Sequence, residues 1–350
     1  MSKIGVPRTL AYFIYYPLWK TFLEELGQEV IVSPPTSREI LDQGVKDAVN
    51  DACIPIKVYH GHAAWLRDKV DYIFSPRLVS VRLFGDFGTE TFCPKFLGLP
   101  DMVRLTVDKL PPLIDTRIGI KKDPREIFNI AAEMGGILGK TEADSNRACR
   151  KALAVHKKYQ KLLAQQVLPP DAIAQLFPDE PETNNKTRKG VVHRHQDALT
   201  AQQLADEEPG LNIAVVGYPY AIYDDYINGG ILGLLSKEKV QVYTQDMLSD
   251  KVLNRQARHL PKSTFWYFSN RAVYGGLHFM KQKRIDGIIH VTAFACGPDS
   301  VVDRLLEIEA HRHNSKPYLS ITIDEHTGEA GIRTRVEAFI DMLNYRRNKK

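Results

Sequence analysis

The sequence predicts an α/β protein built from two similar parallel-sheet domains. Short apolar segments with strand character alternate with segments whose apolar residues recur at helix spacing, which is typical of a parallel sheet wrapped by helices. The opening pattern of the chain returns near residue 212, which indicates an internal duplication. A chain of 350 residues is long for one compact domain and sufficient for two.

The first predicted domain, residues 1–122, opens with an apolar strand at residues 3–6 that ends at a proline. The helix that follows has large apolar side chains every three or four residues. A second strand at residues 30–33 ends at two prolines, and Thr36 or the serine after it is placed to cap the next helix. Residues 71–75 are mostly apolar and predict another buried strand.

The middle of the chain differs from both predicted domains. Residues 123–178 are rich in Ala, Glu, Lys, Arg and Leu, which predicts connecting helices: one long helix, or two shorter ones broken near Gly135 and Gly136. Residues 179–210 are polar and carry many charges, so we expect a linker or mobile insertion. Residues 211–350 form the second predicted α/β domain, which ends in a helix.

The second domain repeats the plan of the first. Residues 212–217 form a strand that runs into Gly-Tyr-Pro, where the first strand runs into Gly-Val-Pro. A further strand is predicted at residues 240–243. Residues 284–290 then parallel residues 69–75, and both segments lead into a loop that carries a cysteine.

Composition and charge disfavour several classes of protein. Hydrophobic residues make up 43% and charged residues 25%, the ordinary balance of a globular protein. The net charge of +5 is spread along the chain, so nucleic-acid binding is not expected. No signal peptide is visible, and no segment approaches the ~18 apolar residues of a membrane span. We expect a cytoplasmic protein without membrane contact, whose four cysteines stay reduced.

Three of the four cysteines share a sequence context. Cys53, Cys93 and Cys296 each have a proline within two residues and lie in or beside a predicted loop, whereas Cys149 lies inside a predicted helix. A thiolate bound to iron needs a rigid backbone, which proline provides. Cys-Pro also recurs in ferredoxin-type cluster motifs. The three cysteines are therefore candidate metal ligands.

Two of these cysteines precede predicted helices. Asp101, after Cys93, and Asp299, after Cys296, are suitable helix N-caps. Each cysteine would then lie close to a helix N-terminus, where backbone N–H groups favour negative charge. An anionic thiolate-bound cluster would be stabilised there. In this architecture, ligands also bind beyond the carboxyl ends of parallel strands.

Three other interpretations of the cysteines stay open. Free cysteines are commonly small buried hydrophobic residues. Zinc could be bound if His60 and His62, or His311 and His313, joined the cysteines as ligands. A nucleophilic cysteine beside a base is the third interpretation, although nothing pairs a particular histidine with a particular cysteine.

Two glycine-rich segments do not match nucleotide-binding motifs. Residues 135–141 lack the first glycine of a P-loop, because Met134 occupies its place. Residues 228–233 lack the dinucleotide fingerprint. The chain therefore shows no nucleotide motif of its own.

Long motifs in the chain resemble the activase-related proteins of 2-hydroxyacyl-CoA dehydratases. The resemblance covers nearly the whole chain except residues 179–210. The segments that carry it are Ile4 to Leu10, Tyr16 to Trp19, Val32 to Thr36, Ala52 to His62, Cys93 to Asp101 and Ala295 to Ser300.

The resemblance implies a fold and a cofactor. Its wider relatives, dehydratase component D and the double-cubane cluster proteins, have two flavodoxin- or Rossmann-like domains with a cluster in the cleft between them. By this resemblance, Cys53, Cys93 and Cys296 would be the cluster ligands. Three cysteines suit a [4Fe-4S] cluster with one iron open to another ligand. A double-cubane [8Fe-9S] cluster, held by six cysteines in its best-known relatives, is the less favoured alternative.

Other side chains near the cysteines could tune such a cluster by hydrogen bonds. We interpret His62 and Tyr220 instead as polar residues at a domain interface. The candidates for contact with the cluster or its ligands are Arg8, Lys57, Tyr59, His60 and Tyr218.

The resemblance also implies partners and a role. In such systems an actin-like ATPase, the activase, carries its own iron–sulfur cluster and passes on a low-potential electron. This chain would then be an electron-transfer or reductase component in anaerobic metabolism, with a dehydratase-like subunit or a second copy as a further partner. The alternatives are a non-catalytic cluster-carrying or scaffold protein and a zinc-binding protein. Whether the chain turns over a substrate is left open.

Overall fold

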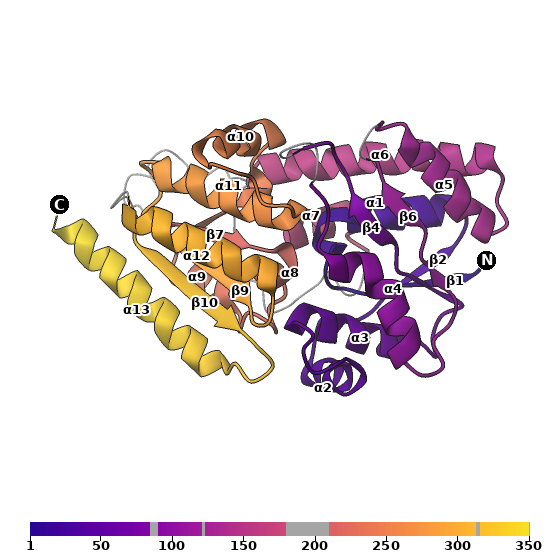
Figure 1. Cartoon of the computed structure of the whole chain (residues 1–350), viewed down its shortest axis with the longest axis horizontal. Helices are drawn as coiled ribbons and strands as arrows, with labels where there is room; N and C mark the ends of the chain where they lie inside the picture. Colours follow the sequence, from indigo (N-terminus) through magenta and orange to yellow (C-terminus); the bar gives the residue numbers. More distant parts are fainter. Residues whose placement is uncertain (85–89, 121–122, 180–209, 313–315, 350) are drawn as a thin grey trace.

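The computed structural model describes residues 1–84, 90–120, 123–179, 210–312 and 316–349. Among them, every strand pairing is parallel, and helices lie between most of the successive strands (Figure 1). The predicted α/β class with parallel sheets is therefore confirmed. None of the described helices is long and apolar enough to cross a membrane.

The N-terminal half, residues 1–179, contains a four-stranded sheet of order β2-β1-β3-β5 and a two-stranded sheet of β4 and β6. Ser37 caps α2 by accepting the Ile40 N–H, as the sequence predicted for this turn. The elements of the sheets and their helices are β1 (Lys3–Val6), α1 (Tyr12–Glu25), β2 (Glu29–Val32), α2 (Arg38–Asp47), α3 (Ile54–Leu66), β3 (Tyr72–Phe74), β4 (Arg77–Ser80), α4 (Pro94–Thr106), β5 (Leu113–Ile114) and β6 (Arg117–Gly119).

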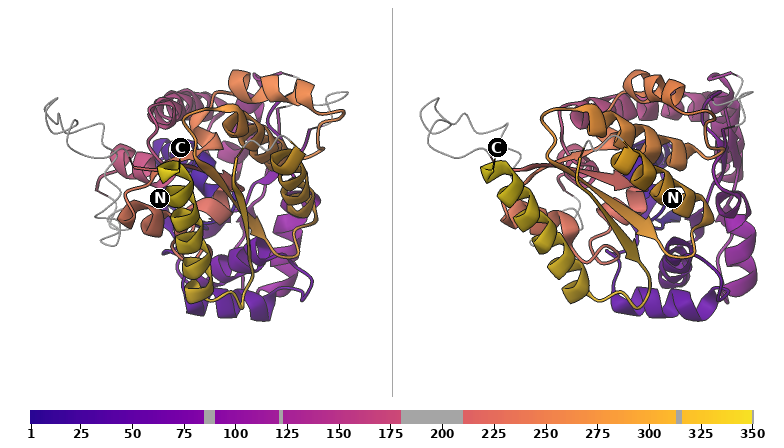
Figure 2. Two further views of the ribbon diagram at one scale, coloured as in Figure 1. Left: turned by 90° about the vertical axis from the view of Figure 1, so that its left-hand side faces the viewer. Right: turned by 60° about the vertical axis from the view of Figure 1, so that its left-hand side comes forward.

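The C-terminal half, residues 210–349, contains a sheet of order β10-β9-β7-β8. Helices α11 and α12 lie on one side of this sheet and α13 on the other (Figure 2). The elements are β7 (Asn212–Gly217), α8 (Pro219–Tyr223), α9 (Ile231–Lys237), β8 (Gln241–Thr244), η3 (Gln245–Met247), α10 (Asp250–Asn254), η4 (Arg255–His259), α11 (Tyr267–Lys281), β9 (Gly287–Ala293), α12 (Gly297–Arg312), β10 (Tyr318–Ile323) and α13 (Glu329–Asn348).

The two four-stranded sheets have the same strand order. In each, the first strand along the chain lies between the second and the third, and the fourth lies beside the third. β1 and β7 therefore occupy equivalent central positions, and both are almost wholly buried. This is the arrangement that the internal repeat predicts. The division of the chain into the four ranges given above stays a prediction.

The connecting region forms α5 (Glu126–Ile137), α6 (Glu142–Ala164) and α7 (Pro169–Leu176). The break between α5 and α6 comes just after the two glycines, because Gly139 has a left-handed φ of 68° and Thr141 caps α6. The interpretation as separate helices is thus the one observed. The predicted linker at 179–210 lies outside the described residues apart from its two end positions.

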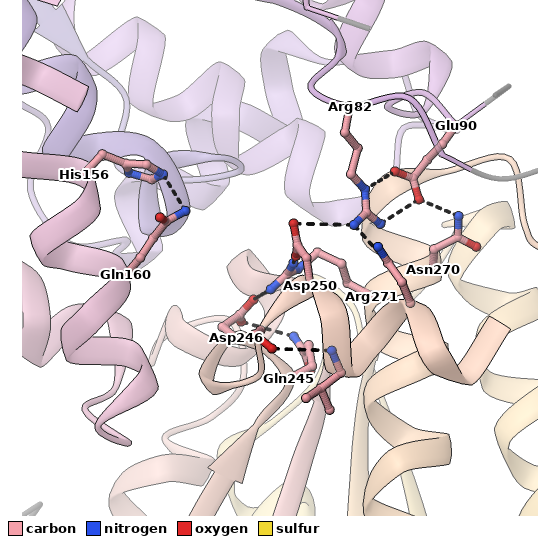
Figure 3. A network of polar contacts seen from close by, with 12 residues as sticks. Arg82, Glu90, His156, Gln160, Gln245, Asp246, Asp250, Asn270 and Arg271 are labelled. Carbon is pink, nitrogen blue, oxygen red and sulfur yellow. Dashed lines mark hydrogen bonds and ion pairs between the residues drawn. The ribbon is translucent and has the colours of Figure 1, made fainter. Parts of the chain in front are cut away.

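A polar network joins the two halves on one side of the molecule (Figure 3). Arg82 makes a two-pronged ion pair with the buried Glu90, at 2.6 and 3.0 Å. Glu90 also accepts a hydrogen bond of 2.6 Å from Asn270 of α11. Asp250 lies 3.6 Å from Arg82 and 2.8 Å from Arg271. Charges from both halves thus neutralise one another at the interface.

Candidate functional site

The three candidate cysteines line one cavity between the two halves. Its volume is about 170 Å³. In the same measure, one water molecule needs only ~10–15 Å³, so the cavity can hold a group much larger than a single ion. Its walls are formed by Leu10, Cys53, Pro55, Ile56, Cys93, Pro94, Lys95 and Phe96 from the N-terminal half, and by Tyr220, Ala295, Cys296, Gly297 and Pro298 from the C-terminal half.

Cys53 and Cys93 are the N-cap residues of two helices in the N-terminal half. Cys53 precedes α3 and Cys93 precedes α4, and each helix has a proline in its first two positions. The backbone N–H of Ile56 donates to the Cys53 carbonyl at 2.9 Å, and that of Phe96 donates to the Cys93 carbonyl at 3.0 Å. The same N–H groups help to lower the pKa of the two thiols. Both thiols therefore face the positive end of a helix.

Cys296 holds the same position in the C-terminal half. It directly precedes α12, and its carbonyl accepts the backbone N–H of Ser300 at 3.0 Å. The residue before it, Ala295, has a left-handed φ of 59°, which is rare for a residue other than glycine and turns the chain into the cavity wall. The thiols of all three cysteines therefore lie at helix N-termini.

We expected Asp101 and Asp299 to cap these helices, and this is wrong. Both helices begin directly after the cysteine, because the adjacent proline is favoured in a first helical turn. Asp101 lies in the second turn of α4 and pairs with Arg77. Asp299 lies in the first turn of α12, where it accepts the Ala293 N–H at 3.1 Å.

The loop that carries Cys93 is anchored to the C-terminal half. Thr91 pairs with Trp266 as an isolated parallel bridge. The Thr91 N–H donates to the carbonyl of Phe265 at 2.9 Å, and the Tyr267 N–H donates to the Thr91 carbonyl at 2.8 Å. The position of Cys93 relative to the second half is thus fixed by main-chain hydrogen bonds.

The charges at the cavity act mainly on Cys53. The neighbouring thiol of Cys296 lowers the pKa of Cys53, against the effect of burial, and Cys53 in turn raises the pKa of Cys296. The Lys95 ammonium lowers the pKa of Cys53 further. Burial raises the pKa of Cys93. It also raises the pKa of Tyr220 well above its usual range, with smaller contributions from the three cysteines that line the same cavity.

None of the five other predicted side chains lines the cavity. Each has another partner. Lys57 pairs with Glu325 of the C-terminal half at 2.5 Å, Tyr59 bonds Ser75, the His60 ring bonds the carbonyl of Ile56, Arg8 lies over the ring of Tyr12, and Tyr218 bonds Ser269.

Sequence reasoning missed two polar residues at the cavity. Lys95 lies in the first turn of α4, two positions after Cys93, and it lines the cavity. Its closeness in sequence to the N-cap cysteine is the signal that could have identified it as a cavity residue. Tyr220, which we interpreted as an interface residue, lines the cavity from α8. No local signal distinguished it from Tyr218.

The histidines belong to other contacts. His62 is fully buried in α3, and its Nε2 lies 3.0 Å from the Thr36 hydroxyl, which also donates to Asp224 of the C-terminal half. His311 lies near the end of α12, and His313 is outside the described residues. Within the described ranges, no group of three or more His, Cys, Asp or Glu side chains is placed to hold one metal ion.

Two protein families match the sequence. Residues 3–248, more than two thirds of the chain, match the family described as CoA enzyme activase uncharacterised domain (DUF2229). Residues 226–343 match the family described as 2-hydroxyglutaryl-CoA dehydratase, D-component. No curated protein matches the chain. The chain belongs to the activase-related, dehydratase-component-D-like family and is thereby tied to 2-hydroxyacyl-CoA dehydratase systems.

Proposed function

We propose that the chain holds an iron–sulfur cluster through Cys53, Cys93 and Cys296 and acts as an electron-transfer or reductase component of a 2-hydroxyacyl-CoA dehydratase-type system. The observation that carries the proposal is that three thiols from three helix N-termini, two in one half and one in the other, line a single cavity.

The residues around the cavity suit a cluster better than a single ion. A single ion needs its ligands around one point, whereas each cysteine of a cluster binds a different iron. The absence of a one-ion site among the described residues is therefore compatible with a cluster in a cavity of about 170 Å³. Three helix N-termini also direct backbone N–H groups at a group that carries negative charge.

The chain's own residues have separate tasks in this proposal. When bound, a cluster of this kind supplies one-electron redox chemistry at low potential. Cys53, Cys93 and Cys296 hold it, and Lys95 offsets its negative charge. Phe96, like the other apolar wall residues, limits access of water and keeps the local dielectric low.

The number of thiols favours a [4Fe-4S] cluster over a larger one. Three cysteines leave one iron of a cubane without a protein thiolate. Cys149, the remaining cysteine, is buried in α6 and does not line the cavity, so it is not placed to fill that position. The [8Fe-9S] alternative would need further ligands from a second chain.

We also propose an actin-like activase ATPase with its own cluster as the electron donor. The support is the family description, which links the N-terminal part of the chain to CoA enzyme activases. Reduction of the chain's cluster that depends on both ATP and such an ATPase would support this partnership. ATP-independent reduction at the same rate would exclude it.

The first test is iron and sulfide analysis of anaerobically purified protein, together with electron paramagnetic resonance (EPR). Wild type should contain roughly four irons per chain. Alanine at Cys53, Cys93 or Cys296 should lower the iron content and change the spectrum. Cys149→Ala is the matched control, because that thiol is buried elsewhere, and it should keep all of its iron.

Each alternative has its own signature in this test. About eight irons would indicate the double cubane. Stoichiometric zinc in place of iron would favour a zinc protein. Wild type without any metal after anaerobic preparation would refute the proposal. An iron content that falls equally in all four variants would show that the cavity is not the site.

A further inference from the structure

We propose that Tyr220 donates a hydrogen bond from its hydroxyl group to the cluster held by the three cysteines, and that this bond raises the reduction potential of the cluster. The inference rests on the proposed function. It assigns a cofactor contact to a residue of the C-terminal half that lies 76 positions from Cys296 in the sequence (296 − 220).

Tyr220 reaches the cavity from a rigid position. It is the second residue of α8, the short helix that follows the carboxyl end of β7, and all five residues of α8 are buried. Only 5% of Tyr220 is exposed, and the residue forms part of the cavity wall. Its place beyond a central parallel strand is where ligands bind in this architecture.

The ring of Tyr220 is held by other aromatic rings. It lies edge-on to Tyr218, with centroids 5.6 Å apart at 87°, and edge-on to Phe268 at 6.1 Å and 83°. Phe268 in turn packs against Phe92 and Phe96 beside Cys93. The direction of the hydroxyl is therefore set by ring packing, without help from a hydrogen bond of its own.

The hydroxyls of neighbouring tyrosines are already bonded within the protein. Tyr218 bonds Ser269, Tyr59 bonds Ser75, and Tyr223 bonds both Thr244 and Asp246. The Tyr220 hydroxyl has no hydrogen bond to another group in the described part of the chain. The hydroxyl is also not among the fully buried side-chain atoms without a partner, so it keeps access to open space, and Tyr220 lines the cavity, where its hydroxyl is free to donate to an acceptor.

The rest of the wall offers few polar groups. Apart from the thiols, the cavity residues with a polar side chain are Tyr220 and Lys95. Lys95 is half-buried and acts on Cys53 from the N-terminal half. Tyr220 is thus the neutral donor on the opposite wall. A tyrosine hydroxyl keeps its proton at neutral pH and can donate to a sulfur or to a ligand on the open iron.

A hydrogen bond to a cluster sulfur stabilises the reduced state more than the oxidised state, because the reduced cluster carries one more negative charge. Removing the donor should therefore make reduction harder. Tyr220→Phe keeps the ring and removes only the hydroxyl. Tyr218→Phe is the matched control, because it removes the hydroxyl of the adjacent tyrosine, which bonds Ser269 instead of facing the cavity.

The experiment is an anaerobic redox titration followed by EPR on wild type and both variants, after iron content has been measured. We expect Tyr220→Phe to retain the iron of wild type and to show a more negative midpoint potential. Tyr218→Phe should match wild type. Equal potentials in wild type and Tyr220→Phe, or equal shifts in the two variants, would overturn the inference.

A second readout begins with wild type, and that part of it does not depend on how the variants fold. Proton electron–nuclear double resonance of the reduced cluster in H₂O and D₂O should reveal an exchangeable proton coupled to the cluster, and Tyr220→Phe should lose that coupling. An iron-loaded wild type with no such proton would overturn the role of Tyr220 while leaving the cluster proposal intact. A wild type without iron would refute the proposed function itself.

Discussion

Replacing Gly61 by alanine tests how the helix that carries Cys53 is held in place. Helices α2 and α3 cross through two glycines that face each other's backbone. A Cβ atom at Gly61 would lie 1.9 Å from the carbonyl oxygen of Ile40, and one at Gly44 would lie 1.8 Å from that of Lys57. Because α3 begins directly after Cys53, this contact also sets the position of the thiol.

The cost of Gly61→Ala follows from this geometry. Ordinary contact with a Cβ begins at 3.4 Å, so the two backbones must separate by 1.5 Å (3.4 − 1.9). A backbone carbonyl cannot rotate away as a side chain can, so the cost should reach the upper end of the ~1–3 kcal/mol typical of overpacking. Alanine returns up to ~1 kcal/mol through its better helix propensity. We expect a net loss of about 2 kcal/mol.

Gly98→Ala is the matched control for this substitution. Gly98 lies in α4, the other N-terminal helix capped by a cavity cysteine, and a Cβ there meets no atom within 4 Å. Urea denaturation should show Gly98→Ala to be as stable as wild type or up to ~1 kcal/mol more stable. If Gly61→Ala and Gly98→Ala unfold at the same urea concentration, the close approach of α2 and α3 does not hold α3 in place.

Two further predictions concern the interface between the halves. Burial raises the pKa of Asp224 from 3.8 to about 6. Its carboxyl therefore favours folding when protonated, and this contribution, about 3 kcal/mol, is lost as the pH rises from 4 to 6. Asp224→Asn should remove that part of the pH dependence from urea titrations; a pH profile like that of wild type would contradict the assignment. Glu90→Ala should cost about 3 kcal/mol, because it leaves Arg82 and Asn270 without their shared buried partner; a loss below ~1 kcal/mol would show that Asp250 alone can neutralise Arg82.

The sequence predicted the positions of the cysteines better than the ends of their helices. A proline close to each of the three cysteines correctly indicated a constrained turn. The same prolines also place the starts of α4 and α12 directly after the cysteine. The reason is that proline is favoured in the first turn of a helix. The capping role went to Asp101 and Asp299 because aspartate is a strong N-cap in general. The proline beside each cysteine is the more specific local signal for where these helices begin.

Which polar side chains face the cavity could not be predicted from their distance to a cysteine in the sequence. Lys57 and His60 follow Cys53 closely, yet Lys57 pairs with Glu325 and the His60 ring bonds a backbone carbonyl. Their spacing from Cys53, four and seven residues, is that of one helix face, so helix geometry alone favours both residues. The partners that each side chain finds decide where it points. Tyr220 faces the thiols only because α8 packs against the other half, a long-range contact that no local pattern encodes.

The cavity therefore depends on the interface between the halves as much as on the cysteines. Two thiols belong to one half and the third to the other, so their spacing is set by contacts that cross between them. The bridge of Thr91 to Trp266 and the pair of Lys57 with Glu325 are such contacts. These contacts are compatible with the proposal that the two halves hold a bound group between them.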